Sequence, residues 1–332
     1  PYTPHALSSA IFTRLMHSRA FGTGIGLLSL LGLFFYYFSG LGDPLEGDRG
    51  LALPSADLWI RPGLADFCAG LACLGLTTAI MVLLNKVYNV LRSMSWLYIA
   101  LFGMMMAATP NLATQFYTGT LLAVVAPGCM FLLFSCFRQP TQTRHIFLIF
   151  LLLSALTATQ YCFAIFIPVF LLGIAQMRVF NARSVVAALL GIITPWWLLL
   201  GFGIVTPASI RIPAFVSIFS EIDLDDTYML LVSVGVTTLA MLVCYVLNLL
   251  KTIAYNAQAR AYNGAFTLLA LVTVAAMCID YHNIISYVPL LNFSASMEIT
   301  HYFSTHRADK SFVAIYLLIA VYAAIFVCQT LI

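Results

Sequence analysis

Eleven apolar runs, each separated from the next by a short polar segment, constrain this sequence more than any other feature. A helix needs about 20 apolar residues to cross the hydrocarbon core of a bilayer. The composition agrees, since 62% of the 332 residues are hydrophobic and only 8% are charged, against roughly 25% charged residues in soluble domains. So little charge cannot cover a soluble surface. The sequence therefore predicts an all-α, polytopic transmembrane helical bundle that forms one integral membrane domain over residues 1–332.

The predicted spans differ in length. They cover residues 20–41, 64–84, 94–109, 113–137, 145–158, 161–177, 184–205, 227–250, 262–279, 284–304 and 311–331. The first run is long and no small-residue cleavage motif follows it, so we interpret it as an uncleaved first span. Residues 8–19 are predicted to form an amphipathic helix in the membrane interface. The fifth and sixth spans form a short helix pair, and the sequence leaves open whether that pair crosses the membrane fully.

The distribution of basic residues predicts the orientation of the bundle. With the N-terminus in the cytoplasm, twelve lysines and arginines fall in cytoplasmic segments and three fall in outer segments. This excess follows the positive-inside rule. It places the N-terminus inside and two loops, 42–63 and 206–226, at the outer face. Because the basic residues stand singly between apolar runs, the charge pattern points to a lipid bilayer as partner and not to nucleic acid.

The first outer loop carries a cluster of acidic residues beside two arginines. Asp43, Glu46 and Asp48 lie within six residues of one another, and Arg49 and Arg61 follow in the same loop. A carboxylate near arginines can act as a general base beside an anion clamp. The three acids are therefore catalytic candidates, and the two arginines are candidates for binding substrate. A divalent metal at the acids is conceivable. The alternative is a solvated loop with no chemical role.

The second outer loop has an acidic patch of its own. Glu221, Asp223, Asp225 and Asp226 follow one basic residue, Arg211. The spacing of the three aspartates resembles a metal-binding sequence, but it lacks the Gly and Glu of an EF-hand loop, so calcium of that type is unsupported. We predict no cofactor, and a divalent metal of another type at Asp223, Asp225 and Asp226 is left open as it is at the first loop. Arg211 is a candidate for binding phosphate at the outer face. The alternative is a solvated helix N-terminus, where acidic residues are favourable.

Glu298 lies within the predicted tenth span, where an acidic residue is unexpected. On a helix, Glu298 and His301 share a face at i and i+3. A carboxylate inside a span costs a few kcal/mol and is usually paired or faces a cavity. Two interpretations stay open. The two residues handle protons or contact substrate, or Glu298 makes an interhelical hydrogen bond that fixes packing.

Several motifs are missing, and their absence narrows the function. The sequence has no Walker A motif, no H-E-x-x-H and no G-x-S-G. An ATP-driven pump, a site-two-type metalloprotease and a rhomboid-type protease therefore lose support. The eight cysteines form no C-x-x-C pair. We interpret them as small apolar residues between helices and not as a disulfide or metal framework.

Two segments resemble a known group of proteins. Residues 145–202 contain the short helix pair, an RVFNAR turn and a TPWW sequence, and residues 287–318 begin with YVPLLNFSASMEITHYFS. Both segments resemble a bacterial family of uncharacterised polytopic inner-membrane proteins, and together they cover about a quarter of the chain. The resemblance implies a multi-pass protein of the bacterial inner (cytoplasmic) membrane and assigns no activity.

The layout is also similar to the polyprenol-dependent GT-C glycosyltransferases. That group shares a polar catalytic first outer loop, a short mid-chain helix pair and basic residues at the cytoplasmic turns. The similarity implies a polyprenyl-phosphate-linked substrate and makes Asp43, Glu46 or Asp48 the catalytic acid. This chain departs from the group in its short first loop and in the sequence TATQ (157–160), where the turn of the helix pair usually carries a lysine.

Three functional hypotheses follow. In the first, the protein handles a lipid-linked envelope glycan substrate at the outer membrane face. In the second, it is a non-catalytic subunit or scaffold that packs with other membrane subunits of an envelope complex. In the third, it is a proton-coupled transporter or flippase that uses Glu298. The sequence leaves open whether the protein is an enzyme.

Overall fold

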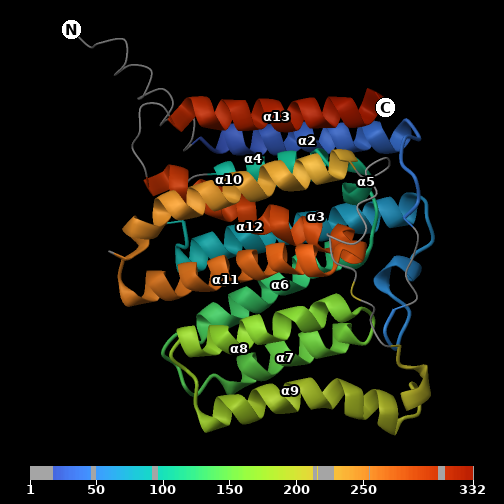
Figure 1. Ribbon diagram of the computed structural model, residues 1–332, viewed down its shortest axis with the longest axis vertical. Helices are drawn as coiled ribbons and strands as arrows, with labels where there is room; N and C mark the ends of the chain where they lie inside the picture. Colours follow the sequence, from blue (N-terminus) through green and yellow to red (C-terminus); the bar gives the residue numbers. More distant parts are fainter. Residues whose placement is uncertain are drawn as a thin grey trace.

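The computed structural model describes residues 18–45, 50–91, 96–211, 215, 228–253, 255–305 and 311–331. Across these residues all regular secondary structure is helical, mostly α with short 3-10 segments. The long helices lie side by side with their axes roughly parallel or antiparallel, and they form a slab that is longest across the helix axes (Figure 1). This confirms the predicted all-α polytopic bundle.

Each of the eleven predicted spans has a helix. The helices are α2 (Arg19–Phe38), α3 (Leu64–Tyr88), α4 (Leu97–Ala107), α6 (Thr118–Ser135), α7 (Thr143–Thr157), α8 (Ile167–Gln176), α9 (Ala182–Gly201), α10 (Tyr228–Ile253), α11 (Ala257–Ile279), α12 (Ile284–Thr305) and α13 (Ser311–Leu331). In the described part of the chain, seven helices are long and apolar enough to cross a membrane. The chain is therefore a multi-pass membrane protein.

The two ends of the slab correspond to the two sides that the charge pattern predicts. The connections that the sequence assigns to the outside, including the loop between α2 and α3, lie on the right in Figure 1, and the turns α6–α7 and α8–α9 lie on the left. We call these the outer and cytoplasmic ends. The interfacial helix predicted over residues 8–19 lies almost wholly outside the described residues.

α12 is the central helix of the bundle. It packs against α4, α6, α10 and α11, and residues 286–301 are all buried. A helix surrounded by other helices can carry polar side chains, because they meet protein partners instead of lipid. The helices at the periphery of the bundle expose apolar side chains instead. α9, for instance, exposes Val186, Leu190 and Trp197 on a face suited to lipid.

Three helices are too short to span a bilayer alone. α4, α7 and α8 have 11, 15 and 10 residues, which is roughly 15–23 Å of helix against about 30 Å of hydrocarbon. Short segments extend them at the outer end. They are α5 (Pro110–Ala113) after α4 and the 3-10 helix η2 (Tyr161–Phe166) before α8, and a further 3-10 helix, η4 (Tyr281–Asn283), joins α11 to α12.

The TATQ break is covered by the first outer loop. The N–H group of Leu51 donates to the carbonyl of Thr159 at 3.3 Å, and the N–H groups of Ala52 and Leu53 donate to the carbonyl of Ala158 at 2.9 and 2.8 Å. The break therefore separates two helices, and protein satisfies the carbonyl groups that α7 leaves free at its end. This agrees with the rule that irregular backbone at membrane depth is buried in protein.

Candidate functional site

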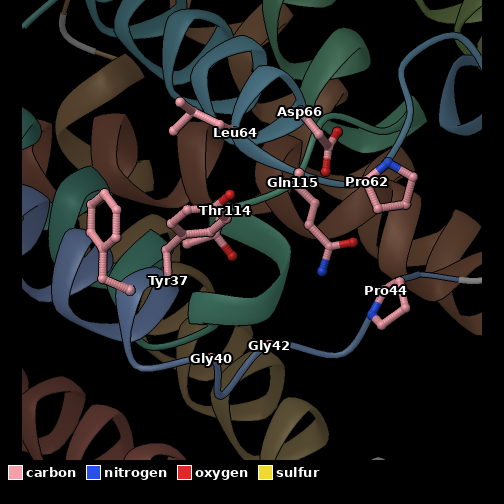
Figure 2. A pocket seen from close by; sticks show the side chains of 11 residues that line it. Tyr37, Gly40, Gly42, Pro44, Pro62, Leu64, Asp66, Thr114 and Gln115 are labelled. Carbon is pink, nitrogen blue, oxygen red and sulfur yellow. The ribbon is translucent and has the colours of Figure 1, made fainter.

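A pocket of about 570 Å³ lies at the outer end of the bundle, between α2, α3 and the turn after α5. Figure 2 shows how the chain surrounds it. Tyr37 and Leu64 form one wall, Asp66 and Gln115 the opposite wall, and the loop over Gly40–Pro44 the floor. One side is therefore aromatic and aliphatic, and the other side carries a carboxylate and an amide. Such a mixed lining suits an amphiphilic ligand.

The apolar wall of the pocket continues into the lipid-facing surface. Phe38 lines the pocket and is 70% exposed. Leu64, on the neighbouring helix, also lines it and is 60% exposed. Side chains of this kind at the end of a span lie at the boundary between lipid and water. The pocket is therefore open toward the surface that suits lipid.

Gln115 holds the floor of the pocket in place. Its amide nitrogen donates to the backbone carbonyl of Asp43 at 2.7 Å and to Oδ1 of Asn111 at 2.8 Å. Its amide oxygen accepts from the N–H group of Leu45 at 2.9 Å. Two of these hydrogen bonds tie the first outer loop to the turn after α5, and the third fixes the side chain against α5. This role could not be predicted from the sequence, because the two loop partners are about 70 residues away from Gln115.

One acidic residue in the first outer loop and one at the start of α3 accept hydrogen bonds from other parts of the protein. Asp57 accepts from the backbone N–H of Thr118 at 2.8 Å and from its hydroxyl at 3.1 Å. Asp66, which is buried, accepts from the N–H group of Phe116 at 2.9 Å. Both carboxylates therefore bond to the backbone at the start of α6, where helices favour negative charge.

Asp43 differs from these two acids. Its side chain is exposed, and its carboxylate makes no hydrogen bond to a described residue. Its neighbours Gly42 and Pro44 line the pocket, and so does Pro62, the neighbour of the exposed Arg61. Of the predicted catalytic acids, Asp43 is the one that the structure describes, and it stands at the edge of the pocket. Glu46, Asp48 and Arg49 lie outside the described residues.

The structure brings Arg211 to the first outer loop. The N–H group of Arg211 donates to the carbonyl of Leu51 at 3.0 Å, and its side chain is exposed. The predicted phosphate-binding residues Arg61 and Arg211 therefore belong to one outer surface. The acidic patch of the second loop (Glu221, Asp223, Asp225 and Asp226) lies outside the described residues.

The outer end also contains a buried carboxylate that the sequence did not single out. Asp280 is fully buried. Its Oδ1 accepts from the Tyr161 hydroxyl at 2.7 Å and from the Asn283 amide at 3.1 Å, and its Oδ2 accepts from the Tyr287 hydroxyl at 2.7 Å. The Gln160 amide in turn donates to Asn283 at 3.3 Å. This network joins η2 to η4 and α12, and we assign it a structural role.

Glu298 and His301 lie on the buried face of α12 but bond to different helices. Glu298, which is 8% exposed, accepts from the Thr267 hydroxyl of α11 at 3.0 Å. His301 shares a hydrogen bond with Asn248 of α10 at 2.5 Å and packs edge-on against the ring of Tyr255. The interhelical hydrogen bond proposed for Glu298 is present. Glu298 also lines a cavity, and a role in proton handling or substrate contact stays a prediction.

That cavity opens at the cytoplasmic end of the bundle. A chamber of about 280 Å³ lies between α10 and α11 with Glu298 in its lining, and a second hollow of about 300 Å³ adjoins it. Three residues line both volumes: Gln176, Arg260 and Gly264. Arg178 lines the second hollow. We call the two volumes together the cytoplasmic cavity.

Metal binding and the comparisons add no further assignment. Among the described residues, no three His, Cys, Asp or Glu side chains are grouped so that they could hold a metal ion. Comparison with protein-family models, curated proteins and solved structures finds no match to this chain. The outer pocket and the cytoplasmic cavity are therefore the features that bear on function.

Proposed function

We propose that the protein binds a lipid-linked envelope substrate at its outer face, in the pocket between α2 and α3. One observation carries this proposal: the pocket has a lipid-facing aromatic wall at Phe38 and a polar wall at Asp66 and Gln115. An amphiphile in the outer leaflet matches both walls at once. A polyprenyl phosphate that carries a glycan has the required chemistry, and the similarity in layout to the GT-C glycosyltransferases agrees with it.

The charged residues at the edge of the pocket complete the proposed site. Arg61 and Arg211 are exposed at the outer surface, where guanidinium groups bind phosphate with two parallel hydrogen bonds. Asp43 is exposed beside the pocket floor and free of structural hydrogen bonds to described residues. It is therefore the carboxylate that can accept a proton from an attacking hydroxyl. In this proposal Asp57 and Asp66 do not react. Their carboxylates bond to the backbone at the start of α6 and hold the site in place.

The test of binding uses a matched pair of phenylalanines. Phe38 and Phe35 lie on the same helix and are 70% and 63% exposed, but only Phe38 lines the pocket. Native mass spectrometry would measure the retention of an added polyprenyl phosphate by the wild type, Phe38→Ala and Phe35→Ala. The proposal expects retention by the wild type and Phe35→Ala and loss in Phe38→Ala. No retention by the wild type, or equal retention by both variants, contradicts it.

The test of chemistry uses the first-loop acids. If Asp43 is the general base, Asp43→Asn retains the bound lipid but lowers glycan transfer by about 100-fold or more. Envelope glycan synthesis that is unchanged by single alanines at Asp43, Glu46 and Asp48 would leave the protein a lipid-binding protein without transferase activity. Co-purification with stoichiometric membrane subunits and no bound polyprenyl lipid favours the scaffold hypothesis instead.

Proton-coupled transport is the second candidate, and the cytoplasmic cavity is the observation that favours it. Glu298 is buried yet lines a cavity that reaches the cytoplasmic end, which is the arrangement expected of a carboxylate that exchanges protons or contacts a cargo. Transport that is lost in Glu298→Gln and retained in Asp43→Asn would support this candidate over the first.

A further inference from the structure

We infer that the cytoplasmic cavity is a binding site for a phosphorylated amine, whose phosphate group sits between Arg178 and Arg260 and whose ammonium group meets Glu298. The ligand has the chemistry of phosphoethanolamine, which occurs as a free solute and as a phospholipid headgroup. This inference is independent of the outer-face proposal. It depends on cavity shape, on charge, and on polar groups that the protein leaves without partners.

Charge is arranged along the cavity from positive to negative. Arg178 and Arg260 line the hollow at the cytoplasmic end, both are exposed, and neither makes an ion pair with a described residue. Glu298 lines the inner chamber. On α11, Arg260, Asn263, Gly264 and Thr267 follow the helical repeat, so they form one stripe that is roughly 10 Å long. A ligand that is complementary to this stripe is anionic at one end and cationic at the other.

Two polar groups between these ends lack partners among the described residues. Oε1 of Gln176 and Nδ2 of Asn263 are both shielded from solvent, and neither has a hydrogen-bond partner among the described residues. Both side chains line the inner chamber. Buried amide groups are almost always hydrogen-bonded, and leaving one unpaired is costly because the group has lost its water. One group is an acceptor and the other a donor, as a ligand with an ammonium group and a phosphate group requires.

The charge at each end selects the chemical groups of the ligand. Two guanidinium groups offer more donors than one carboxylate can accept, and they match the oxygens of a phosphate. Among the described residues, Glu298 has one hydrogen-bond donor, the Thr267 hydroxyl at 3.0 Å, although a buried carboxylate needs a charged partner or a proton. A primary ammonium group supplies that partner and has further donors for the Gln176 oxygen.

Arg178 supports the inference by its backbone conformation. It follows the end of α8 with φ at 59°, in the left-handed region where helix ends usually carry glycine. That conformation is strained for an L-residue with a Cβ atom. Here the position holds an arginine whose side chain lines the cavity. Arg138 has the same conformation, with φ at 55°, and does not line the cavity, so it provides a matched control.

The cavity is also open to the membrane. Leu249 and Leu271 line the inner chamber and are 44% and 40% exposed, on helices whose outer faces suit lipid. A headgroup could therefore enter from the inner leaflet, and a free solute could enter from the cytoplasm. The recognition chemistry is the same for both sources, so the experiment must distinguish them.

The first experiment measures binding of free phosphoethanolamine by calorimetric titration of the full chain in nanodiscs of phosphatidylglycerol. We expect saturable binding by the wild type. In Arg178→Gly, affinity should fall about 10-fold or more through loss of a charged hydrogen bond, while thermal stability stays equal or rises because glycine relieves the backbone strain. Arg138→Gly should have the same effect on stability and leave affinity unchanged.

Two further variants test the inner end. In Glu298→Gln, phosphoethanolamine should bind no better than inorganic phosphate, whereas the wild type should prefer the amine by about 10-fold or more. Gly264→Leu fills the cavity and should abolish binding. The atoms nearest to a methyl group at Gly264 belong to the Gln176 side chain, at 3.6–3.9 Å, so this variant can keep the fold. Binding that is unchanged in Arg178→Gly or in Gly264→Leu overturns the inference.

The second experiment identifies the source of the ligand. Native mass spectrometry after exchange into nanodiscs of equal phosphatidylethanolamine and phosphatidylglycerol measures which lipid stays bound. Selective retention of phosphatidylethanolamine by Arg138→Gly but not by Arg178→Gly shows that the ligand is a headgroup. Titration with free phosphoethanolamine and no selective retention shows that the ligand is a solute. Absence of both results shows that the cavity holds only water and overturns the inference.

Discussion

Tyr161 donates a 2.7 Å hydrogen bond to the carboxylate of Asp280, a residue 119 positions further along the chain. This bond joins the short helix pair, α7 and α8, to the turn between α11 and α12. Three donors surround Asp280, and no described residue places a positive charge against it. The network therefore holds the outer end of the bundle through hydrogen bonds to a fully buried carboxylate.

The first prediction concerns this network. Tyr161→Phe removes one of the three donors and should destabilise the fold by about 1–3 kcal/mol. Asp280→Ala leaves all three donors without their acceptor and should cost more. Thermal unfolding in detergent measures both effects. Tyr228→Phe is the control, because Tyr228 is exposed at the start of α10. Equal melting temperatures for Tyr161→Phe and Tyr228→Phe would show that the network adds no stability.

The second prediction concerns Gly50, which lets the first outer loop lie against the TATQ break. Its φ is 72°, and a methyl group on its Cα would lie 2.5 Å from the carbonyl oxygen of Thr159 and 2.1 Å from that of Leu53. Gly50→Ala should therefore detach the loop from the break, lower the melting temperature and expose the loop to protease. Gly75→Ala should be neutral or stabilising, since Gly75 is helical with open space around it. Equal protease resistance in the two variants contradicts this account of the loop.

The third prediction separates the acids at the outer end. Asp57→Ala removes the acceptor for two groups of Thr118 and should cost about 1 kcal/mol, as the loss of a helix cap does. Asp43→Ala should leave the melting temperature unchanged, because Asp43 is exposed and bonds to no described residue. Thermal unfolding of both variants checks this contrast. A loss of stability in Asp43→Ala equal to that in Asp57→Ala would make Asp43 structural and remove it from the candidate site.

The fourth prediction concerns orientation. In a variant whose eight native cysteines are replaced, Arg61→Cys and Arg183→Cys place single thiols at exposed positions on opposite ends of the slab. A membrane-impermeant maleimide added to intact cells should label Arg61→Cys, and Arg183→Cys only after the membrane is opened, because the excess of basic residues marks the cytoplasmic side. The reverse pattern would invert the bundle and exchange the sides of the two cavities.

Local signals predicted the elements well and their ends less well. α9 and α11 begin at Ala182 and Ala257, before the predicted starts at 184 and 262, because Asn181 and Asn256 cap their first turns. Asparagine is a preferred N-cap residue, so the sequence alone could have predicted these two helix starts. α4 is only 11 residues long, and the turn at Thr109 and Pro110 that follows it was visible as well.

The sequence by itself determined that this chain crosses a membrane many times and where its helices fall, because apolar length acts locally along the chain. Its basic residues predict which way the chain faces. Only the tertiary structure decided what the polar residues do. It gave Asp57 and Asp280 structural partners, left Asp43 exposed at a pocket, and placed Glu298 beside a cavity that also contains Arg260. Those roles depend on contacts between helices far apart in sequence, and hydropathy and charge counts contain no information about such contacts.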